Sequence, residues 1–101
     1  MKKANLFIDL LTEVLDCAGK EERAIFDGKE SPWDLKQIQE VVIPETNELL
    51  SYAKKGEAYF KYGRHERLLE SAYLITDSLN DLAHTDLGEC ILKVQDFYDK
   101  L

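Results

Sequence analysis

The sequence predicts an all-α fold: a single antiparallel bundle of four to five helices, with one helix kinked or broken near Pro44. Apolar residues recur at spacings of three and four along most of the chain, which is the pattern of one helix face. β-branched residues are too scattered to indicate a sheet, and prolines and glycines fall at the expected helix boundaries. Because each apolar face must be covered by another, residues 1–101 are expected to form one helical domain.

The first helix is expected over residues 3–18. Its buried face comprises Phe7, Leu10, Leu11, Val14 and Ala18, with Leu6 and Leu15 beside it. Gly19 is placed to end this helix, because glycine is common just after a helix C-terminus. A separate short turn of helix is expected over residues 21–26, ended by Asp27 and Gly28.

The second helix is expected to begin in the segment Ser31-Pro32-Trp33-Asp34. Ser31 can accept a hydrogen bond from the first turn, Pro32 suits the first helical position, and Asp34 complements the helix dipole. The helix then presents Leu35, Ile38 and Val42. Pro44 lacks a backbone donor and crowds the preceding turn, so we expect a kink or break near Val42. The continuation carries Leu49, Leu50 and Ala53 and ends around Lys55 and Gly56.

Residues 64–82 are predicted to form a helix with two opposed stripes, while the conformation of residues 57–62 is left open. The apolar stripe comprises Leu68, Ala72, Ile75, Leu79 and Leu82. The opposite stripe comprises Glu66, Glu70, Tyr73, Asp77 and Asp81. The charge order opposes the helix dipole, because the expected first turn carries Arg64 and Arg67 and the expected end carries Asp77 and Asp81. Such a broken rule indicates either a binding face or ordinary solvated acids with local ion pairs.

The last helix is expected after a turn over residues 80–85. Asp86 and Glu89 have the spacing of a capping box, with aspartate in the usual place of serine or threonine. Its apolar face comprises Leu87, Ile91, Val94, Tyr98 and Leu101, widened by Cys90 and Phe97. Cys17 and Cys90 are the only cysteines, too few for a disulfide framework, and both are interpreted as small core residues.

The composition indicates a globular protein that meets positively charged partners. Hydrophobic residues make up 45% and charged residues 33% of the chain, and the net charge is −7. This charge argues against non-specific binding to nucleic acid or to anionic membranes, and favours association with a basic partner. Lys2 and Lys3 precede acidic residues rather than an uncharged apolar run, and no apolar run approaches the ~20 residues of a membrane span. We therefore expect a cytoplasmic protein without membrane contact.

Catalytic patterns are missing from the sequence. His65 and His84 form no metal-ligand spacing with each other or with a cysteine cluster. The serines lack the flanking glycines of a nucleophile elbow, and no glycine-rich phosphate loop is present. We therefore expect no enzyme activity, no cofactor and no bound metal.

One basic segment offers a nucleic-acid alternative. Lys54, Lys55, Lys61, Arg64 and Arg67 lie among Tyr59, Phe60 and Tyr62. Aromatic rings among cations can stack on bases and hold phosphates. The acidic remainder of the chain would repel the same polyanion, so a role of these rings in capping the bundle is favoured over nucleic-acid binding.

Two acidic zones flank this basic centre. Residues 9–50 carry 11 acidic and 4 basic side chains, and residues 70–99 carry 7 acidic side chains and only Lys93. The stripe of Glu66, Glu70, Tyr73, Asp77 and Asp81 is the first choice for a partner-binding face. The second choice lies in the first zone and comprises Asp27, Glu30, Trp33, Asp34, Glu40, Glu45 and Glu48. Trp33 either anchors a partner there or fastens the second helix to the core.

The stretch IPETNELLSYAKKGEAYFKYGRHERLLESAYLITDSLND, residues 43–81, resembles the small helical immunity proteins of bacterial contact-dependent inhibition and related polymorphic-toxin systems. Size, acidity and helical content agree with this resemblance. It implies a cytoplasmic protein that binds its cognate toxin domain, often a nuclease, and blocks it. It assigns no site residues, because the binding surfaces of these proteins differ with each toxin.

A toxin that cleaves nucleic acid carries a basic cleft, and a rigid acidic helix can occupy such a cleft in place of phosphates. The alternative is a helical regulatory adaptor that exposes Trp33 or Val41 for pairing, for example in a homodimer. The sequence leaves open the toxin's chemistry, the oligomeric state, and whether inhibition covers the active site or a separate surface.

Overall fold

The computed structural model describes residues 2–55, 68–77 and 81–100. The helices are α1 (Lys2–Phe26), α2 (Leu35–Gln37), α3 (Ile43–Lys54), α4 (Glu70–Thr76) and α5 (Asp86–Asp99), and a π-helical segment η1 (Ile38–Val42) joins α2 to α3. No strand occurs in these three ranges. The predicted all-α fold is therefore confirmed.

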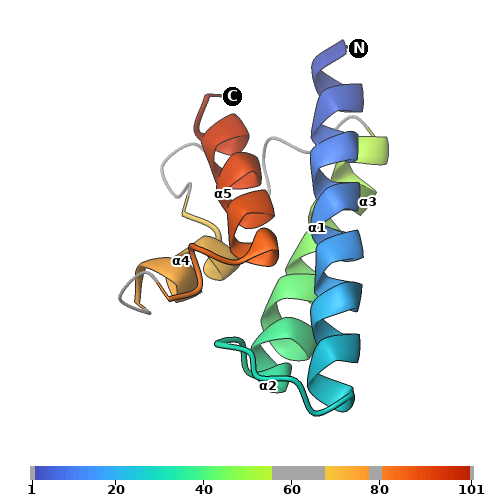
Figure 1. The fold of residues 1–101 in the computed structure, drawn as a ribbon. Helices are drawn as coiled ribbons and strands as arrows, with labels where there is room; N and C mark the ends of the chain where they lie inside the picture. The colour runs from blue at the N-terminus through green and yellow to red at the C-terminus, as the bar shows by residue number, and fades with distance from the viewer. Residues whose placement is uncertain (1, 56–67, 78–80, 101) are drawn as a thin grey trace.

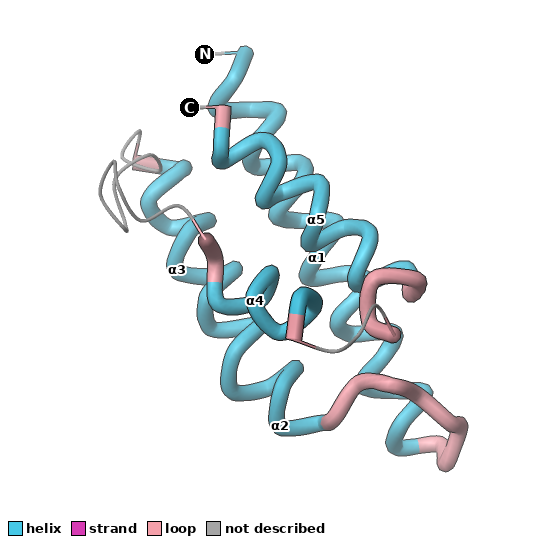
Figure 2. The backbone as a smooth tube through the Cα atoms, turned by 90° about the vertical axis from the view of Figure 1, so that its left-hand side faces the viewer, coloured by secondary structure: helices cyan, strands magenta, loops and turns pink. Residues whose placement is uncertain are grey.

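The three longest helices pack side by side as an antiparallel bundle. α1 contacts both α3 and α5, and it runs opposite to each of them (Figure 1). α4 lies across the bundle against α5 and η1 (Figures 1 and 2). As a result, the start of α1 and the end of α5 lie at the same end of the molecule, while α4 lies beside the start of α5, near the middle of the molecule.

One continuous core joins the helices. Its fully buried members from α1 are Phe7, Leu11, Val14 and Ala18, as the helical spacing predicted, whereas Leu10 is only half-buried. The rest of the described chain contributes Trp33, Ile38, Val42, Leu49, Ala53, Leu69, Ala72, Ile75, Leu82, Leu87, Ile91, Val94 and Tyr98. The Phe7 ring stacks on Phe97 with a centroid distance of 5.3 Å and on Tyr98 with 6.3 Å, which fixes α1 against α5.

α1 is one helix, so the predicted end at Gly19 is wrong. Gly19 lies inside it, where a Cβ would meet no atom within 4 Å. The helix continues because residues beyond Gly19, including Ile25, still pack against the core. It ends where Asp27 and Gly28 were expected to end a helix: Gly28 has a φ of 81°, and its N–H donates to the Ile25 carbonyl at 3.0 Å.

The second helical region begins later than predicted. The Ser31 hydroxyl accepts from the Trp33 N–H at 3.0 Å and donates to the Glu21 carboxylate, so it shapes the connecting turn and does not cap the helix. The helix starts at Leu35, after Asp34 at the cap position. The Gln37 side chain accepts from the Asp34 N–H at 2.8 Å, which satisfies one backbone donor at this end.

Pro44 is accommodated by a change of helix type. The π-helical segment η1 ends at Val42, and the Ile43 N–H donates to the Ile38 carbonyl five residues back. The irregularity therefore falls where the kink or break was predicted, directly before a proline that has no N–H to continue the α-helical pattern. The extra residue in the turn leaves Ile38 and Val42 buried on the same side.

The predicted helix over residues 64–82 is too long. Leu68 and Leu69 are not helical, and Leu69 has the extended φ and ψ of −71° and 146°. α4 spans only Glu70–Thr76, and residues 81–84 form turns. Leu69 is buried in place of Leu68, which is 54% exposed, because the extended backbone turns the next side chain inward. Arg64, Glu66, Arg67 and Leu79 lie outside the described residues, as does the segment 57–62.

The N-cap residue of α5 lies one position earlier than predicted. Thr85, not Asp86, is the N-cap, and its hydroxyl accepts from the Gly88 N–H at 2.9 Å. Asp86 and Glu89 lie in the first turn, where their charges suit the helix dipole. Gly88 is required by close packing, since a Cβ there would lie 1.9 Å from the Leu82 carbonyl oxygen.

Across the described ranges, every helix is too short or too polar to cross a membrane.

Candidate binding surface

α4 is held in place at its N-terminus by two buried side chains from other helices. The Glu45 carboxylate on α3 accepts from the backbone N–H groups of Glu70 at 2.8 Å and Ser71 at 2.9 Å, and from the Ser71 hydroxyl at 2.7 Å. The Gln95 side chain on α5 accepts from the Leu69 N–H at 2.8 Å. These contacts satisfy the donors that a helix leaves exposed at its start, with a negative charge at the favourable end of the dipole.

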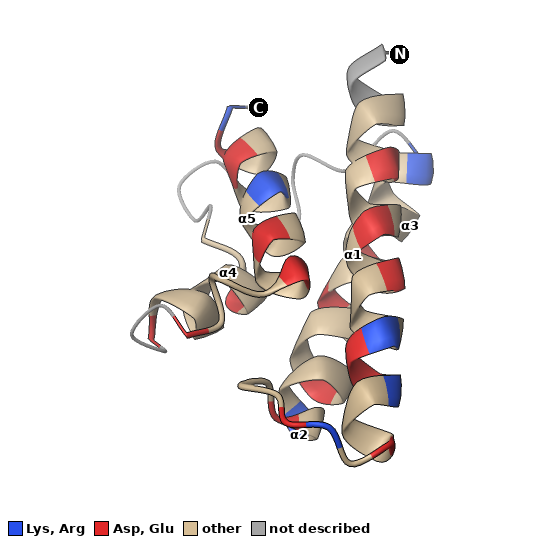
Figure 3. Cartoon of the chain, in the orientation of Figure 1, with Lys and Arg blue, Asp and Glu red and all other residues tan. Residues whose placement is uncertain are grey.

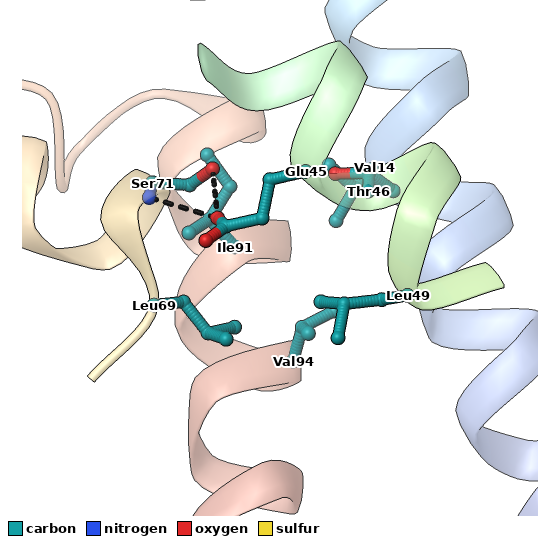
Figure 4. Close-up of a pocket in the computed structure, with 8 residues that line it drawn as sticks. All are labelled: Val14, Glu45, Thr46, Leu49, Leu69, Ser71, Ile91 and Val94. Atoms are coloured by element: carbon teal, nitrogen blue, oxygen red, sulfur yellow. Dashed lines mark hydrogen bonds between the residues drawn. The ribbon is translucent and has the colours of Figure 1, made fainter. Parts of the chain in front are cut away.

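The junction that holds α4 encloses only a small space (Figure 4). Its lining comprises Val14, Glu45, Thr46, Leu49, Leu69, Ser71, Ile91 and Val94, which come from α1, α3, α5 and the start of α4. The space open to the centre of a water-sized sphere is about 10 Å³. That volume fits at most one water molecule. This cavity is therefore a junction of the core and not a substrate pocket.

The opposite side of α4 presents a mixed acidic and aromatic face. Glu70, Tyr73 and Asp77 follow one another at spacings of three and four, and all three are exposed. Tyr73 is 56% exposed, which is high for an aromatic side chain on a helix of a packed bundle. The buried side of the same helix consists of Ser71, Ala72 and Ile75. We call Glu70, Tyr73 and Asp77 the α4 face.

The structure keeps only part of the predicted acidic stripe on one helix. Asp81 is exposed but lies in the turn that precedes α5, and Glu66 lies outside the described residues. Glu70 falls in the first turn of α4, where its charge agrees with the helix dipole, and the arginines expected at the helix start, Arg64 and Arg67, lie outside the described residues. Asp77, at the C-terminal cap, still opposes the dipole.

The carboxylates of the α4 face and of Asp81 form no ion pairs with other described residues. The ion pair found there joins Lys100 to Asp96 at 3.1 Å, far along the chain on α5 and exposed to solvent. Glu70, Asp77 and Asp81 have no hydrogen bond through their side chains within the same ranges. Their charges are therefore available to a partner.

The second-choice surface loses two of its seven members. Trp33 is 3% exposed and Glu45 is 4% exposed, so neither can contact a partner. Trp33 instead fastens the start of the second helix to the core, as the alternative interpretation held. The remaining members, which are Asp27, Glu30, Asp34, Glu40 and Glu48, are exposed but spread from the end of α1 to α3. The adaptor hypothesis also loses Trp33 as an exposed anchor, and Val41 is half-buried.

Sequence reasoning missed a further acidic row on α1. Asp9, Glu13 and Asp16 are exposed at spacings of four and three. Acidic segments recur along α1 and also on α5 in Figure 3. The helical spacing of these acids was visible in the sequence, but the α1 row contains no exposed aromatic residue. The α1 row is therefore a suitable control for the effect of charge without an aromatic contact.

The basic segment is only partly described. Lys54 and Lys55 are exposed at the end of α3, and the other cations and the aromatic rings of that segment lie outside the described residues. His84 is exposed in the turn before α5. Among the described residues, no group of three or more histidine, cysteine, aspartate or glutamate side chains is placed to hold a metal ion.

The two cysteines meet between α1 and α5. Both are reduced and half-buried, and their Sγ atoms lie 3.2 Å apart. Burial, followed by the hydrogen bond and charge of Cys17 and by the charge of Glu13, raises the pKa of the Cys90 thiol to about 12, while Lys93 acts in the opposite direction. The prediction that they are small core residues did not anticipate this contact, because sequence spacing does not align two distant helices.

No protein-family model, no curated protein and no solved structure matches this chain. The fold and the surface therefore define its class: a small helical bundle that presents an acidic face with one exposed aromatic ring.

Proposed function

We propose that this chain is an immunity protein that binds and neutralises a cognate toxin domain, a nuclease, through the α4 face and Asp81. The observation that carries the proposal is the exposure of Glu70, Asp77 and Asp81, without ion pairs among the described residues, around a tyrosine that is 56% exposed. The net charge of −7 adds a long-range attraction for a basic partner. The resemblance of residues 43–81 to immunity proteins points to the same function and to the bacterial cytoplasm.

The chemistry of a nuclease explains why such a face inhibits it. An enzyme that cleaves nucleic acid binds phosphates in a basic cleft, and carboxylates on a helix can replace those phosphates. Complementary charge speeds the encounter and rejects wrong partners. Tyr73, between Glu70 and Asp77, then supplies the apolar contact area that anchors the complex.

The anchoring of α4 supports this role. An isolated helix of 7 residues is unstable in water, so a binding face on it needs tertiary support. Glu45 and Gln95 supply that support from two other helices. A face that is rigid before binding loses less conformational freedom when the complex forms.

The test first determines whether the reading frame directly upstream encodes a large protein that ends in a toxin domain, and then uses that domain as the binding partner. Binding is measured by calorimetry and stopped-flow fluorescence for the wild type and two charge-matched triple variants. The first variant carries Glu70→Gln, Asp77→Asn and Asp81→Asn. The second carries Asp9→Asn, Glu13→Gln and Asp16→Asn on α1, and so loses the same charge from another surface. Circular dichroism verifies that both remain folded.

We expect the first variant to associate about 10-fold more slowly and to bind about 10- to 100-fold more weakly, with a smaller effect in the second. Tyr73→Ala should mainly accelerate dissociation, since it removes contact area and not charge. Equal losses in both triple variants would mean that net charge alone matters, and would remove the α4 face from the proposal. A salt-insensitive homodimer that binds no upstream toxin domain would instead indicate the adaptor.

A further inference from the structure

The side chains of Cys17 and Cys90 are in contact, although most of the chain lies between these two residues. Their Sγ atoms are 3.2 Å apart, although the residues are 73 positions apart in sequence. One thiol belongs to α1 and the other to α5, the two helices that also share the stacked rings of Phe7 and Phe97. A disulfide bond is about 2.0 Å long, so the two sulfurs need to approach by roughly one ångström.

The surroundings give the two thiols different roles. Cys90 keeps its proton at neutral pH, because burial and the neighbouring Cys17 and Glu13 raise its pKa to about 12 against the influence of Lys93. The hydrogen bond between the two sulfurs can therefore run from the Cys90 S–H to the Cys17 Sγ. Cys90 is therefore the weaker nucleophile of the pair, and we assign the first attack to Cys17, with Cys90 as the thiol that completes the reaction.

We propose that Cys17 and Cys90 form a redox-active dithiol, which a peroxide oxidises to an intramolecular disulfide that locks α1 to α5. The Cys17 sulfur attacks one oxygen of hydrogen peroxide. An S–O bond forms, the O–O bond breaks, and the departing hydroxide takes up a proton to become water. The Cys90 sulfur then attacks the Cys17 sulfur; an S–S bond forms, the S–O bond breaks, and the hydroxyl leaves with the Cys90 proton as a second water. The two sulfurs together lose two electrons, which reduce the peroxide.

The disulfide links α1 to α5 covalently and should therefore stabilise the bundle. The new bond closes a loop that includes η1, α3 and α4, so it restricts the unfolded chain strongly. Folded α1 and α5 already lie in contact and need to move little. We expect the oxidised protein to melt roughly 10 °C or more above the reduced protein, and to return to the lower value after treatment with dithiothreitol.

The first experiment treats the reduced full-length chain with hydrogen peroxide and measures its intact mass, its oligomeric state and its tryptic peptides. We expect a monomer that has lost two hydrogen atoms, with the peptide of Cys17 linked to that of Cys90. Oxygen addition at separate cysteines, or disulfide-linked dimers without the internal bond, would overturn the proposal. Complete internal oxidation with an unchanged melting temperature would contradict the claim that the disulfide stabilises the bundle.

Two matched variants test the order of reaction. In Cys90→Ser the resolving thiol is missing, so a sulfenic acid at Cys17 should accumulate and be trapped by dimedone. In Cys17→Ser the remaining thiol, Cys90, is half-buried and keeps its proton, so we expect trapping at least about 10-fold slower at pH 7. Equal trapping in the two variants would overturn the assignment of Cys17 as the nucleophile. Circular dichroism of each reduced variant shows whether it has the wild-type fold before peroxide is added.

Discussion

The Trp33 indole Nε1 donates a hydrogen bond of 2.9 Å to the Thr85 hydroxyl, across 52 positions of sequence. The same hydroxyl donates to the Leu82 carbonyl at 2.7 Å and accepts from the Gly88 N–H at 2.9 Å. A threonine hydroxyl has one donor and two acceptor positions, and all are used here. The Thr85 side chain thus caps α5, closes the preceding turn and accepts a hydrogen bond from the tryptophan that precedes α2.

Replacing Thr85 should therefore destabilise the protein more than the loss of an ordinary helix cap. Thr85→Ala leaves both the Gly88 N–H and the buried Trp33 N–H without this acceptor, and we expect a loss of about 2–4 kcal/mol in the free energy of unfolding. Thr85→Ser keeps the hydroxyl and should lose about 1 kcal/mol or less. Urea denaturation followed by circular dichroism measures both. Similar losses in the two variants would show that the methyl group, and not the hydroxyl, matters at this position.

Glu45→Gln tests the anchor of α4. Both carboxylate oxygens of Glu45 accept hydrogen bonds from the start of α4, whereas a glutamine must turn an NH₂ group toward one of these donors. We expect a loss of about 1–3 kcal/mol in the free energy of unfolding and faster hydrogen exchange in α4. Glu40→Gln removes the same charge from an exposed position and is the control. Unchanged exchange in α4 would contradict the role of Glu45.

Two glycine substitutions should change stability in opposite directions. At Gly19 a Cβ meets nothing within 4 Å inside a regular helix, so Gly19→Ala should stabilise the protein by about 0.5–1 kcal/mol. At Gly88 a Cβ would lie 1.9 Å from a backbone oxygen, so Gly88→Ala should destabilise it by about 1–3 kcal/mol or more. Thermal melts of both variants measure the difference. An unchanged or raised melting temperature for Gly88→Ala would show that the packing at Gly88 relaxes freely, and a lowered one for Gly19→Ala would contradict the open space at Gly19.

The raised pKa of Cys90 predicts a loss of stability in alkali. The folded thiol titrates at about 12, while the reference value for the unfolded chain is 9.0. Below pH 9 both states keep the proton and the stabilising contribution is fully present. Between pH 9 and 12 the unfolded chain releases its proton first, so this contribution falls as the pH rises.

Under reducing conditions, the stability of the wild type should therefore fall more steeply from pH 8.5 to pH 11 than that of Cys90→Ala. Tyrosines and lysines titrate in the same range, but they do so in both proteins, and the difference between the two curves isolates the thiol. Parallel curves would mean that Cys90 titrates normally in the folded protein.

Much of the fold was predictable because its causes are local. The apolar spacing of Phe7, Leu11, Val14 and Ala18 identified the buried face of α1, and Pro44 located the helix irregularity that became η1. Asp27 and Gly28 marked the end of α1, where the positive φ of Gly28 suits glycine.

The errors occurred where packing overrode a local signal. Gly19 did not end α1, because the residues beyond it still reach the core. The helix predicted over residues 64–82 begins in the described structure only at Glu70. There the Glu45 carboxylate accepts from the first backbone N–H groups of the helix, and the Gln95 side chain accepts from the N–H of Leu69. A side chain 25 positions away cannot be recognised as a helix cap from spacing alone. For the same reason, the burial of Glu45 and the meeting of Cys17 with Cys90 were not predicted, and the sequence left open whether Trp33 is exposed or buried.

The sequence by itself determined the helical fold class, the excess of negative charge and the acidic and aromatic composition of the α4 face. These properties depend on residue type and on spacing within one turn or two of helix, so they can be read along the chain. Only the tertiary structure decided which acids remain exposed, where α4 begins and which sulfurs touch. Those outcomes depend on contacts between helices that are far apart in sequence, where the burial of a whole face outweighs the preference of any single residue.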